Sequence, residues 1–322
     1  MELDSYLQGY MTTRPASHSK TWYSSDPNEL STNICTYITP PVSTSPPSSH
    51  LLYKSLIAPH AGYRFSGKVA GFSFHALESI LSSSSQPIRR IFILGPSHYL
   101  SIYNSLAVTS HTFYETPLGT LSVDRVTTER LIKTINASSI ISSKILSHED
   151  DSNEHSIEMH LPFIAHLLKK YNKFDTISII PILVGQCSNE AQDALGQILS
   201  KYIIENDTFF CVSSDFCHFG EKFKFQPILG PPDQLYLGIT KLDKTGMDLI
   251  ESQSIEGFRD YLRFSKNTIC GRYPILILLC ALKFSTPCVF KINWKAYAQS
   301  DRVISPQMSS VSYASAVIHQ ES

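Results

Sequence analysis

The chain has 322 residues, of which 42% are hydrophobic and 17% are charged, and its formal net charge is -1 at pH 7. This composition suits a globular protein with a sizeable core. The balanced charge argues against broad nucleic-acid binding, which usually requires a strongly basic surface.

The first part of the chain, up to about His50, is polar and irregular. Its start, Met1–Met11, is polar and acidic rather than basic and then apolar, so we expect no secretory signal. The motif Ser17–Tyr23 carries one of the two tryptophans and is expected to be ordered. The Pro/Ser-rich stretch near residues 39–50 predicts a surface loop or flexible insertion.

From Leu51 onward, predicted strands alternate with predicted helices. Apolar runs predict strands at Leu56–Ala58, Ile91–Leu94, Ile177–Val184, Phe209–Val212, Val289–Ala298 and Ser309–Ile318. Helical spacing predicts helices at Gly67–Leu81, Ser156–Tyr171, Glu190–Ile204, Gln234–Glu251, Ile255–Phe264 and Pro274–Phe284. Strands that are apolar without alternation are buried on both faces, as in a sheet between two layers of helices. The sequence therefore predicts one α/β domain over residues 1–322, with a central, mostly parallel or mixed sheet.

Three of the predicted strands are followed closely by a histidine: His60, His98 and His218. In open α/β sheets ligands bind beyond the carboxyl ends of the strands, so neighbouring parallel strands would bring these side chains together. A single histidine at a strand end is more often a satisfied polar residue. Because the pattern occurs three times, we expect a shared pocket.

Cys270 is a fourth candidate for this pocket. Pro274 fits the start of a helix, which places Cys270 just ahead of a helix N-terminus with Arg272 close by. Both features lower the pKa of a thiol and favour the thiolate that binds metal. The alternative is a buried, inert cysteine. The chain has seven cysteines but no C-x-x-C pair, which favours a reducing location. We expect the cytoplasm, with the nucleus as an alternative.

The segment His148–His160 is rich in histidine and acidic residues. If it is helical, His155 and His160 point roughly 140° apart and make a poor ligand pair, whereas His155 and Glu158 share a face. We expect His155 to line the pocket or to support its ligands.

Six blocks of the sequence resemble the Memo proteins, which are named for mediating cell motility. These are A-P-H-A-G-Y (Ala58–Tyr63), I-F-I-L-G-P-S-H (Ile91–His98), E-H-S-I-E-M-H-L-P-F (Glu154–Phe163), S-S-D-F-C-H (Ser213–His218), T-I-C-G-R-Y-P (Thr268–Pro274) and S-V-S-Y-A (Ser310–Ala314). The resemblance implies the fold of class III extradiol, non-haem iron dioxygenases. It also implies a metal site formed by His60, His98 and Cys270, with Asp215 and His218 beside it.

This resemblance leads to a first functional hypothesis, a redox-active centre holding iron(II) or copper. The dioxygenases use a carboxylate as third ligand, whereas a cysteine here would be a softer, oxidisable ligand, which argues against ring cleavage. His218, held by Asp215, would handle protons. The centre would serve an oxidoreductase or a redox role in cell signalling.

Two alternatives stay open. The pocket, with Arg64 and Arg272 nearby, could bind a small molecule or a phosphorylated or acidic peptide, as a signalling adaptor would. Alternatively, the site could hold zinc and hydrolyse a substrate, with His218 as the base. A bound anion without metal would favour the first, and stoichiometric zinc the second.

Overall fold

A computed structural model of the chain describes residues 11–38, 51–83, 86–228 and 230–321. The Pro/Ser-rich stretch at residues 39–50 lies outside the described residues. Among those described, the strands are β1 (Thr13–Arg14), β2 (Leu52–Ala58), β3 (Arg90–Pro96), β4 (Ser105–Val108), β5 (Phe113–Thr116), β6 (Gly119–Ser122), β7 (Ser142–Ile145), β8 (Ser178–Val184), β9 (Thr208–Ser213), β10 (His218–Phe219), β11 (Phe290–Gln299) and β12 (Ser310–Gln320). The α-helices are α2 (Pro27–Ile38), α3 (Tyr63–Ser82), α4 (Arg125–Asn136), α5 (His148–Asn153), α6 (Leu161–Lys170), α7 (Asn189–Ile203), α8 (Leu235–Glu251), α9 (Ile255–Ser265) and α10 (Arg272–Lys283).

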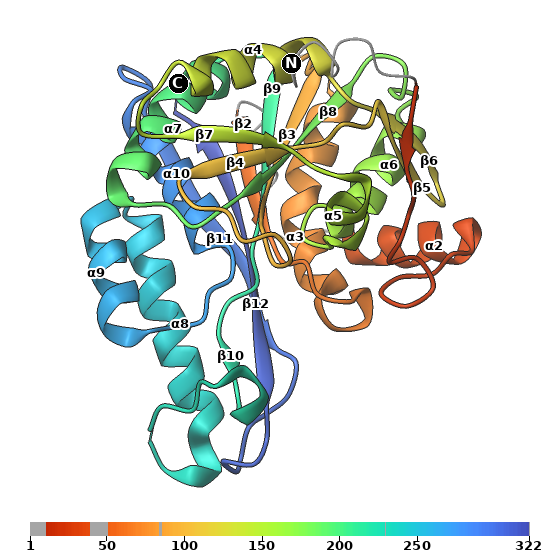
Figure 1. Ribbon diagram of the computed structural model, residues 1–322. Helices are drawn as coiled ribbons and strands as arrows, with labels where there is room; N and C mark the ends of the chain where they lie inside the picture. Colours follow the sequence, from red (N-terminus) through yellow and green to blue (C-terminus); the bar gives the residue numbers. More distant parts are fainter. Residues whose placement is uncertain (1–10, 39–50, 84–85, 229, 322) are drawn as a thin grey trace.

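Nine of the strands form one mixed sheet at the centre of the molecule (Figure 1). Its strand order is β10-β12-β2-β9-β3-β8-β4-β7, and β11 pairs with β12. The four central strands β2, β9, β3 and β8 are parallel. β12 and β4 run antiparallel to the central strands that they flank. A smaller sheet contains β1, β5 and β6.

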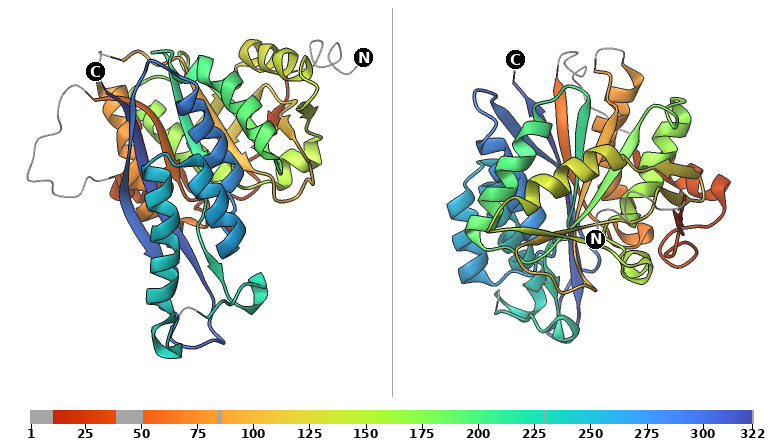
Figure 2. Two further views of the ribbon diagram at one scale, coloured as in Figure 1. Left: turned by 90° about the vertical axis from the view of Figure 1, so that its left-hand side faces the viewer. Right: turned by 45° about the horizontal axis from the view of Figure 1, so that its top comes forward.

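Both faces of the central strands are buried, as their continuous apolar character predicts. In β3, Phe92 and Leu94 belong to a core formed with α4, α7, α9 and α10, whereas Ile91 and Ile93 belong to a core formed with α2, α3 and α6. Figure 2 shows the two helix layers on either side of the sheet. The predicted α/β architecture, a mixed sheet between helices, is confirmed.

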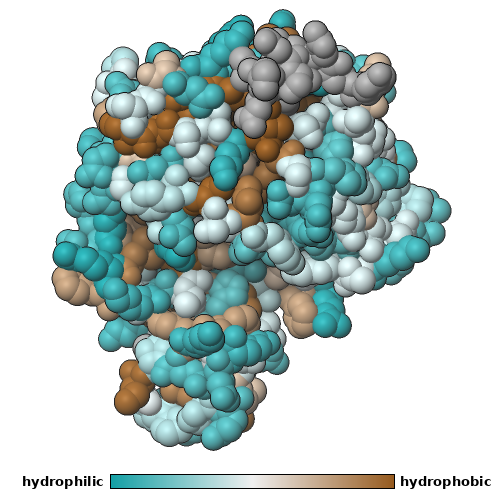
Figure 3. All heavy atoms as spheres, viewed as in Figure 1, coloured by the Kyte–Doolittle hydropathy of each residue, from teal (hydrophilic) through white to brown (hydrophobic). Residues whose placement is uncertain are grey.

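The lower end of the molecule is formed by β10, the start of α8 and the β11–β12 connection, which project beyond the main body (Figure 1). On the face seen in Figure 3, this projection and the body are covered mainly by hydrophilic and neutral residues, with hydrophobic residues in smaller groups between them. Among the described residues, no helix is both long and apolar enough to span a membrane.

Candidate metal centre

The parallel strands β2, β3 and β9 bring the predicted pocket residues together. β9 lies between β2 and β3 and is parallel to both, so the carboxyl ends of the three strands lie side by side. His60 comes two residues after β2, His98 two residues after β3, and Asp215 two residues after β9. The ring centroids of His60 and His98 are 5.2 Å apart. The two histidines therefore share one site, as the strand-end pattern predicts.

His155 completes a tight group of three imidazoles with His60 and His98. One ligand nitrogen from each lies within 4.8 Å of the others. The His155 ring stacks on that of His98, with ring centroids 4.5 Å apart. Its Nδ1 is buried and has no hydrogen-bond partner among the described residues. A buried nitrogen without a partner is costly, so it marks a position where an additional ligand or ion would be favourable.

The helical argument about His155 and His160 is wrong, because the backbone is not helical at His155. A 3-10 turn at Glu158–His160 precedes α6, which begins only at Leu161. His160 instead packs beneath β2, with its Nε2 3.2 Å from the carbonyl oxygen of Ala58. Burial lowers the pKa of His160 to about 4.

Hydrogen bonds at the far side of the His60 ring determine which nitrogen carries its proton. The Ser213 hydroxyl donates to the carbonyl oxygen of Ser156 at 2.6 Å, so its oxygen accepts from Nδ1 of His60 at 2.7 Å. Nε2 of His60 therefore carries a lone pair. Burial lowers the pKa of His60 well below its ordinary value, so the ring is neutral at neutral pH.

His98 and His218 have the same proton arrangement. Nδ1 of His98 lies 2.9 Å from one carboxylate oxygen of Glu154, which also accepts from the backbone N–H of His155. The other oxygen of Glu154 accepts from the backbone N–H of His98. Nδ1 of His218 lies 2.8 Å from the carbonyl oxygen of Phe216. Acceptors at Nδ1 leave Nε2 as the lone-pair nitrogen in both rings, which is the form that binds metal.

Cys270 lies against this histidine group. Its Sγ is 3.1 Å from Nε2 of His60 and accepts from the backbone N–H of Asp215 at 3.2 Å. The expectation of a lowered thiol pKa is wrong for the metal-free chain: burial raises the pKa of Cys270, and the nearby charge of Asp215 raises it further, outweighing Arg272. A bound metal ion would reverse this balance, because a coordinating thiol is deprotonated.

Gly271 is required for the close approach of Cys270 to β9. A Cβ atom at this position would lie 2.4 Å from the carbonyl oxygen of Ser213, and such a contact forces the backbone to move. The backbone N–H of Gly271 also donates to the Ser214 hydroxyl at 3.1 Å. α10 begins at Arg272, two residues before Pro274, so Cys270 immediately precedes the Gly271 cap.

Asp215 supports His60 rather than His218. Its Oδ1 accepts from the backbone N–H of His60 at 2.9 Å, whereas the His218 ring is positioned by backbone carbonyl groups. The expected support of His218 by Asp215 is therefore wrong. Burial raises the pKa of the Asp215 carboxyl to about 7, so it gains or loses a proton near neutral pH.

Comparison with known proteins relates this chain to a family. A family model described as Memo-like protein matches residues 14–317. This chain belongs to the Memo family. It is 38% identical to "Protein memo-1 homolog" of Caenorhabditis elegans over 95% of this chain and 82% of that protein. It is 35% identical to "Protein MEMO1" of Homo sapiens, over 97% of this chain and 99% of the human protein.

Two further proteins are similar to this chain. The chain is 33% identical to "MEMO1 family protein MHO1" of Saccharomyces cerevisiae, over 96% of this chain and 99% of the yeast protein. A crystal structure of an uncharacterized protein from Escherichia coli K12 aligns with a TM-score of 0.48 and 12% sequence identity, covering 80% of this chain and 98% of that chain.

Two clefts of this Memo-family chain are lined by residues of the predicted pocket. One, of about 330 Å³, is lined by residues that include His98, His218, Cys270 and Arg272. The other, of about 720 Å³, is lined by the segment around Trp22 and by Arg64. The two arginines expected at one pocket thus line different clefts. Arg272 also donates to the carbonyl oxygen of Ile269 at 3.0 Å.

The N-terminal segment contributes to the site in a way that the strand-end pattern does not predict. The rings of Trp22 and His155 are 4.6 Å apart, and His18 lies next to both. Glu158 holds this segment, because its carboxylate accepts from Nδ1 of His18 at 2.8 Å and from Tyr23 at 2.6 Å. The expectation that the Ser17–Tyr23 motif is ordered is confirmed. The tryptophan in this motif is the sequence feature that indicated it.

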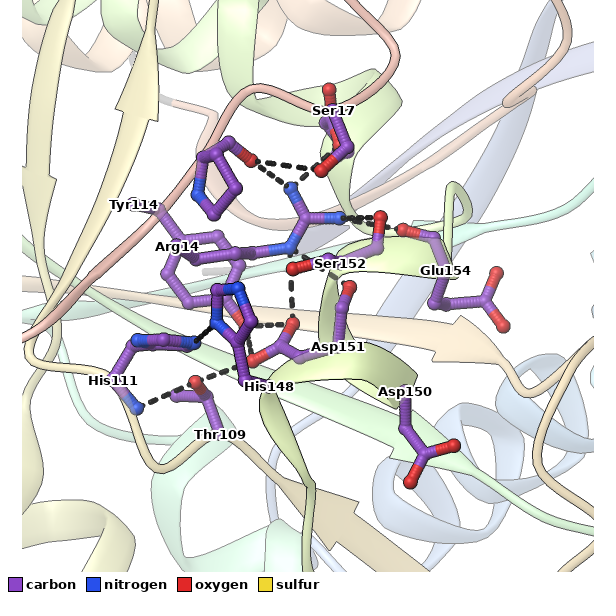
Figure 4. Close-up of polar contacts among 12 residues, drawn as sticks. Arg14, Ser17, Thr109, His111, Tyr114, His148, Asp150, Asp151, Ser152 and Glu154 are labelled. Atoms are coloured by element: carbon purple, nitrogen blue, oxygen red, sulfur yellow. Dashed lines mark hydrogen bonds and ion pairs between the residues drawn. The ribbon is translucent and has the colours of Figure 1, made fainter.

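A buried arginine links the same segment to the chain around the site. Arg14 is 1% exposed and forms ion pairs with Asp151 at 3.0 Å and with Glu158 at 2.6 Å. Figure 4 shows its guanidinium group among backbone and side-chain oxygens of the segment that includes α5 and Glu154. These contacts position Glu154, which in turn orients His98.

Proposed function

We propose that this Memo-family chain holds a redox-active metal, iron(II) or copper, between His60, His98 and Cys270, and serves an oxidoreductase or redox role in cell signalling or motility. The observation that carries the proposal is the contact between Nε2 of His60 and Sγ of Cys270 at 3.1 Å. Nδ1 of the same ring donates to the Ser213 hydroxyl oxygen. The lone pair on Nε2, which faces Sγ of Cys270, is therefore the one that this ring can offer to a metal ion.

The donor atoms fit such a metal. Imidazole nitrogen suits iron, copper and zinc, and thiolate selects soft or borderline ions over magnesium or calcium. Glu154 and Ser213 bind the far nitrogens of His98 and His60, which is the usual arrangement behind metal-bound histidines. A bound iron or copper ion would supply one-electron redox chemistry. His155, whose Nδ1 accepts and donates no hydrogen bond among the described residues and lies 3.6 Å from a Glu154 carboxylate oxygen, is close enough to support the same ion.

Two further residues can hold and move protons beside the donor atoms. Asp215 has a pKa raised by burial to about 7, so its carboxyl can act as donor or acceptor near neutral pH. His218 offers the lone pair of Nε2, because its Nδ1 is committed to carbonyl oxygens. Since His98, His218 and Cys270 line the cleft of about 330 Å³, a small molecule in it would lie beside both the metal ligands and a proton acceptor.

Metal analysis of protein purified without oxygen, with iron(II) or copper(I) supplied, tests the proposal. We expect about one ion per chain in the native protein and in the Cys288→Ser control, which alters a cysteine two residues before β11. We expect loss of the ion in His60→Ala and Cys270→Ser. Unchanged binding in both variants would overturn the assignment of ligands. A preference for zinc, with no oxidation of the bound metal on exposure to oxygen, would favour the alternative of a zinc-dependent hydrolase.

The larger cleft supports the adaptor as a second candidate. Its volume of about 720 Å³ and its lining by Lys20, Trp22 and Arg64 suit an aromatic or acidic peptide side chain. Binding of a fluorescent phosphopeptide by metal-free protein, weakened by Arg64→Ala and unchanged in Cys270→Ser, would favour this function. Binding that requires both the metal and Cys270 would favour the redox centre.

A further inference from the structure

A second pair of histidines lies outside the candidate metal centre. His111 lies in the connection between β4 and β5, and His148 is the first residue of α5. Nδ1 of His148 is 3.1 Å from Nε2 of His111, and the two rings are nearly perpendicular, at 72°. Figure 4 shows the two rings meeting beside the Arg14–Asp151 network.

His111 is held firmly at this position. Its residue is only 5% exposed, and its backbone N–H donates to the Thr109 hydroxyl oxygen at 2.9 Å. Nδ1 of the ring lies 3.1 Å from Oγ1 of Thr12. When Thr12 accepts from this nitrogen, Nε2 carries the lone pair that faces His148. A metal-bound histidine is usually oriented in this way, by a hydrogen bond from its other ring nitrogen.

His148 lies at the surface, where an ion from solvent can reach it. It is exposed, and it begins a helix whose first turn is fixed by the Ser147 hydroxyl accepting from the backbone N–H of Asp150 at 3.0 Å. The pair also lies in negative surroundings, because Glu149, Asp150 and Asp151 follow it directly. Arg14 pairs with Asp151 and compensates its charge, so the negative charges that remain beside the two histidines are those of Glu149 and Asp150. An incoming cation would be attracted to this position.

We propose that Nε2 of His111 and Nδ1 of His148 form a second metal site, for a borderline divalent ion such as Zn²⁺ or Cu²⁺, with water completing the coordination. Imidazole nitrogens suit these two ions. Two nitrogens bound to one tetrahedral zinc ion lie about 3.3 Å apart, given zinc–nitrogen distances of roughly 2.0–2.1 Å. The observed 3.1 Å is close to this separation. Binding requires the ring proton of His148 to move from Nδ1 to Nε2, which keeps the imidazole neutral, and both rings to turn so that their lone pairs point at one ion.

An ion at this site would tie the β4–β5 connection to the start of α5. α5 ends at Asn153, immediately before Glu154 and His155 of the candidate metal centre. The second site would therefore stabilise the segment from which the first one is built. It does not depend on the first site, because none of its ligands is shared.

Zinc binding in a chain that lacks the first centre tests the proposal. In the double variant His60→Ala, Cys270→Ser, equilibrium dialysis against Zn²⁺ should retain about one ion per chain. Adding His148→Ala should remove this ion, whereas adding His75→Ala should leave it. His75 is a suitable control because it is a half-buried histidine whose ring contacts Glu78 rather than another imidazole.

Electron paramagnetic resonance with Cu²⁺ identifies the ligands in the same proteins. We expect nitrogen hyperfine structure that is lost with His148→Ala and kept with His75→Ala. Because His148 is exposed, its replacement should leave the fold intact, which circular dichroism would verify. Equal zinc retention and equal copper spectra with and without His148 would overturn the second site and leave the proposed redox centre unaffected.

Discussion

Replacing Glu158 by glutamine should weaken the attachment of the N-terminal segment to the site. The Glu158 carboxylate is fully buried and accepts hydrogen bonds from Arg14, His18 and Tyr23. Glutamine has nearly the same shape but presents an NH₂ group in place of one oxygen. That group would face a donor on His18 or Arg14, so at least one buried donor would lose its partner.

The size of the effect follows from the pKa of Glu158. Burial alone would raise this pKa, but the hydrogen bond from His18 and the charge of Arg14 outweigh burial and lower it to about 2. Compared with about 4.3 for an exposed glutamate, this corresponds to roughly 3 kcal/mol of stability. Because the folded pKa is the lower one, this stability is complete above the unfolded pKa. It is lost as pH falls toward about 2, and about half remains at pH 3.

Urea unfolding from pH 7 down to pH 3 measures this contribution. We expect Glu158→Gln to reduce the free energy of unfolding by about 3 kcal/mol at pH 7 and by about half as much at pH 3. Glu78→Gln is a suitable control, since Glu78 forms a partly exposed pair with Lys170 and should cost less than about 1 kcal/mol. Trp22 fluorescence, read in a Trp294→Phe background, should shift toward that of an exposed indole. A loss below about 1 kcal/mol, or one independent of pH, would refute the reasoning.

Three other predictions concern the metal centre. Ser213→Ala and Glu154→Gln should each lower metal affinity by about 10–100-fold in chelator competition while leaving the ligands in place. Gly271→Ala should lower the thermal unfolding midpoint of the metal-free chain, at a cost of about 1–3 kcal/mol, because its Cβ meets the carbonyl of Ser213. An unchanged unfolding midpoint would contradict the inference that a Cβ at position 271 clashes with the carbonyl of Ser213. His218→Gln should retain the metal, since Cys270 and not His218 is the proposed ligand; loss of the ion in a folded variant would make His218 a ligand.

The sequence predicts the central sheet because its strands are short, continuous apolar runs, a pattern typical of strands that are buried on both faces. The short strands β4–β7, together with α2 and α4, were not predicted. β7 shows why: half of it is exposed, so it lacks the apolar pattern that marks the central strands. The convergence of His60 and His98 could be predicted from their positions after strand ends, because the carboxyl ends of neighbouring parallel strands lie at the same edge of the sheet.

Other parts of the site depend on tertiary contacts that no local pattern contains. His155 joins the group because its backbone is not helical and precedes a 3-10 turn. The Glu154 carboxylate stabilises this conformation by accepting from three backbone N–H groups. The pKa of Cys270 depends on how deeply the thiol is buried, which neither the helix start nor Arg272 reveals. Trp22 reaches His155 only because Glu158, more than 100 positions away in the sequence, holds Arg14 and Tyr23 of the N-terminal segment.

X-ray absorption at the metal edge of protein loaded without oxygen tests the central claim most directly, because it reports the ligand atoms themselves. The arrangement of His60, His98 and Cys270 predicts a mixed shell containing one sulfur and at least two imidazole nitrogens. The sulfur contribution should disappear in Cys270→Ser and persist in Cys288→Ser. A shell of nitrogen and oxygen alone in the native protein would contradict the proposed centre.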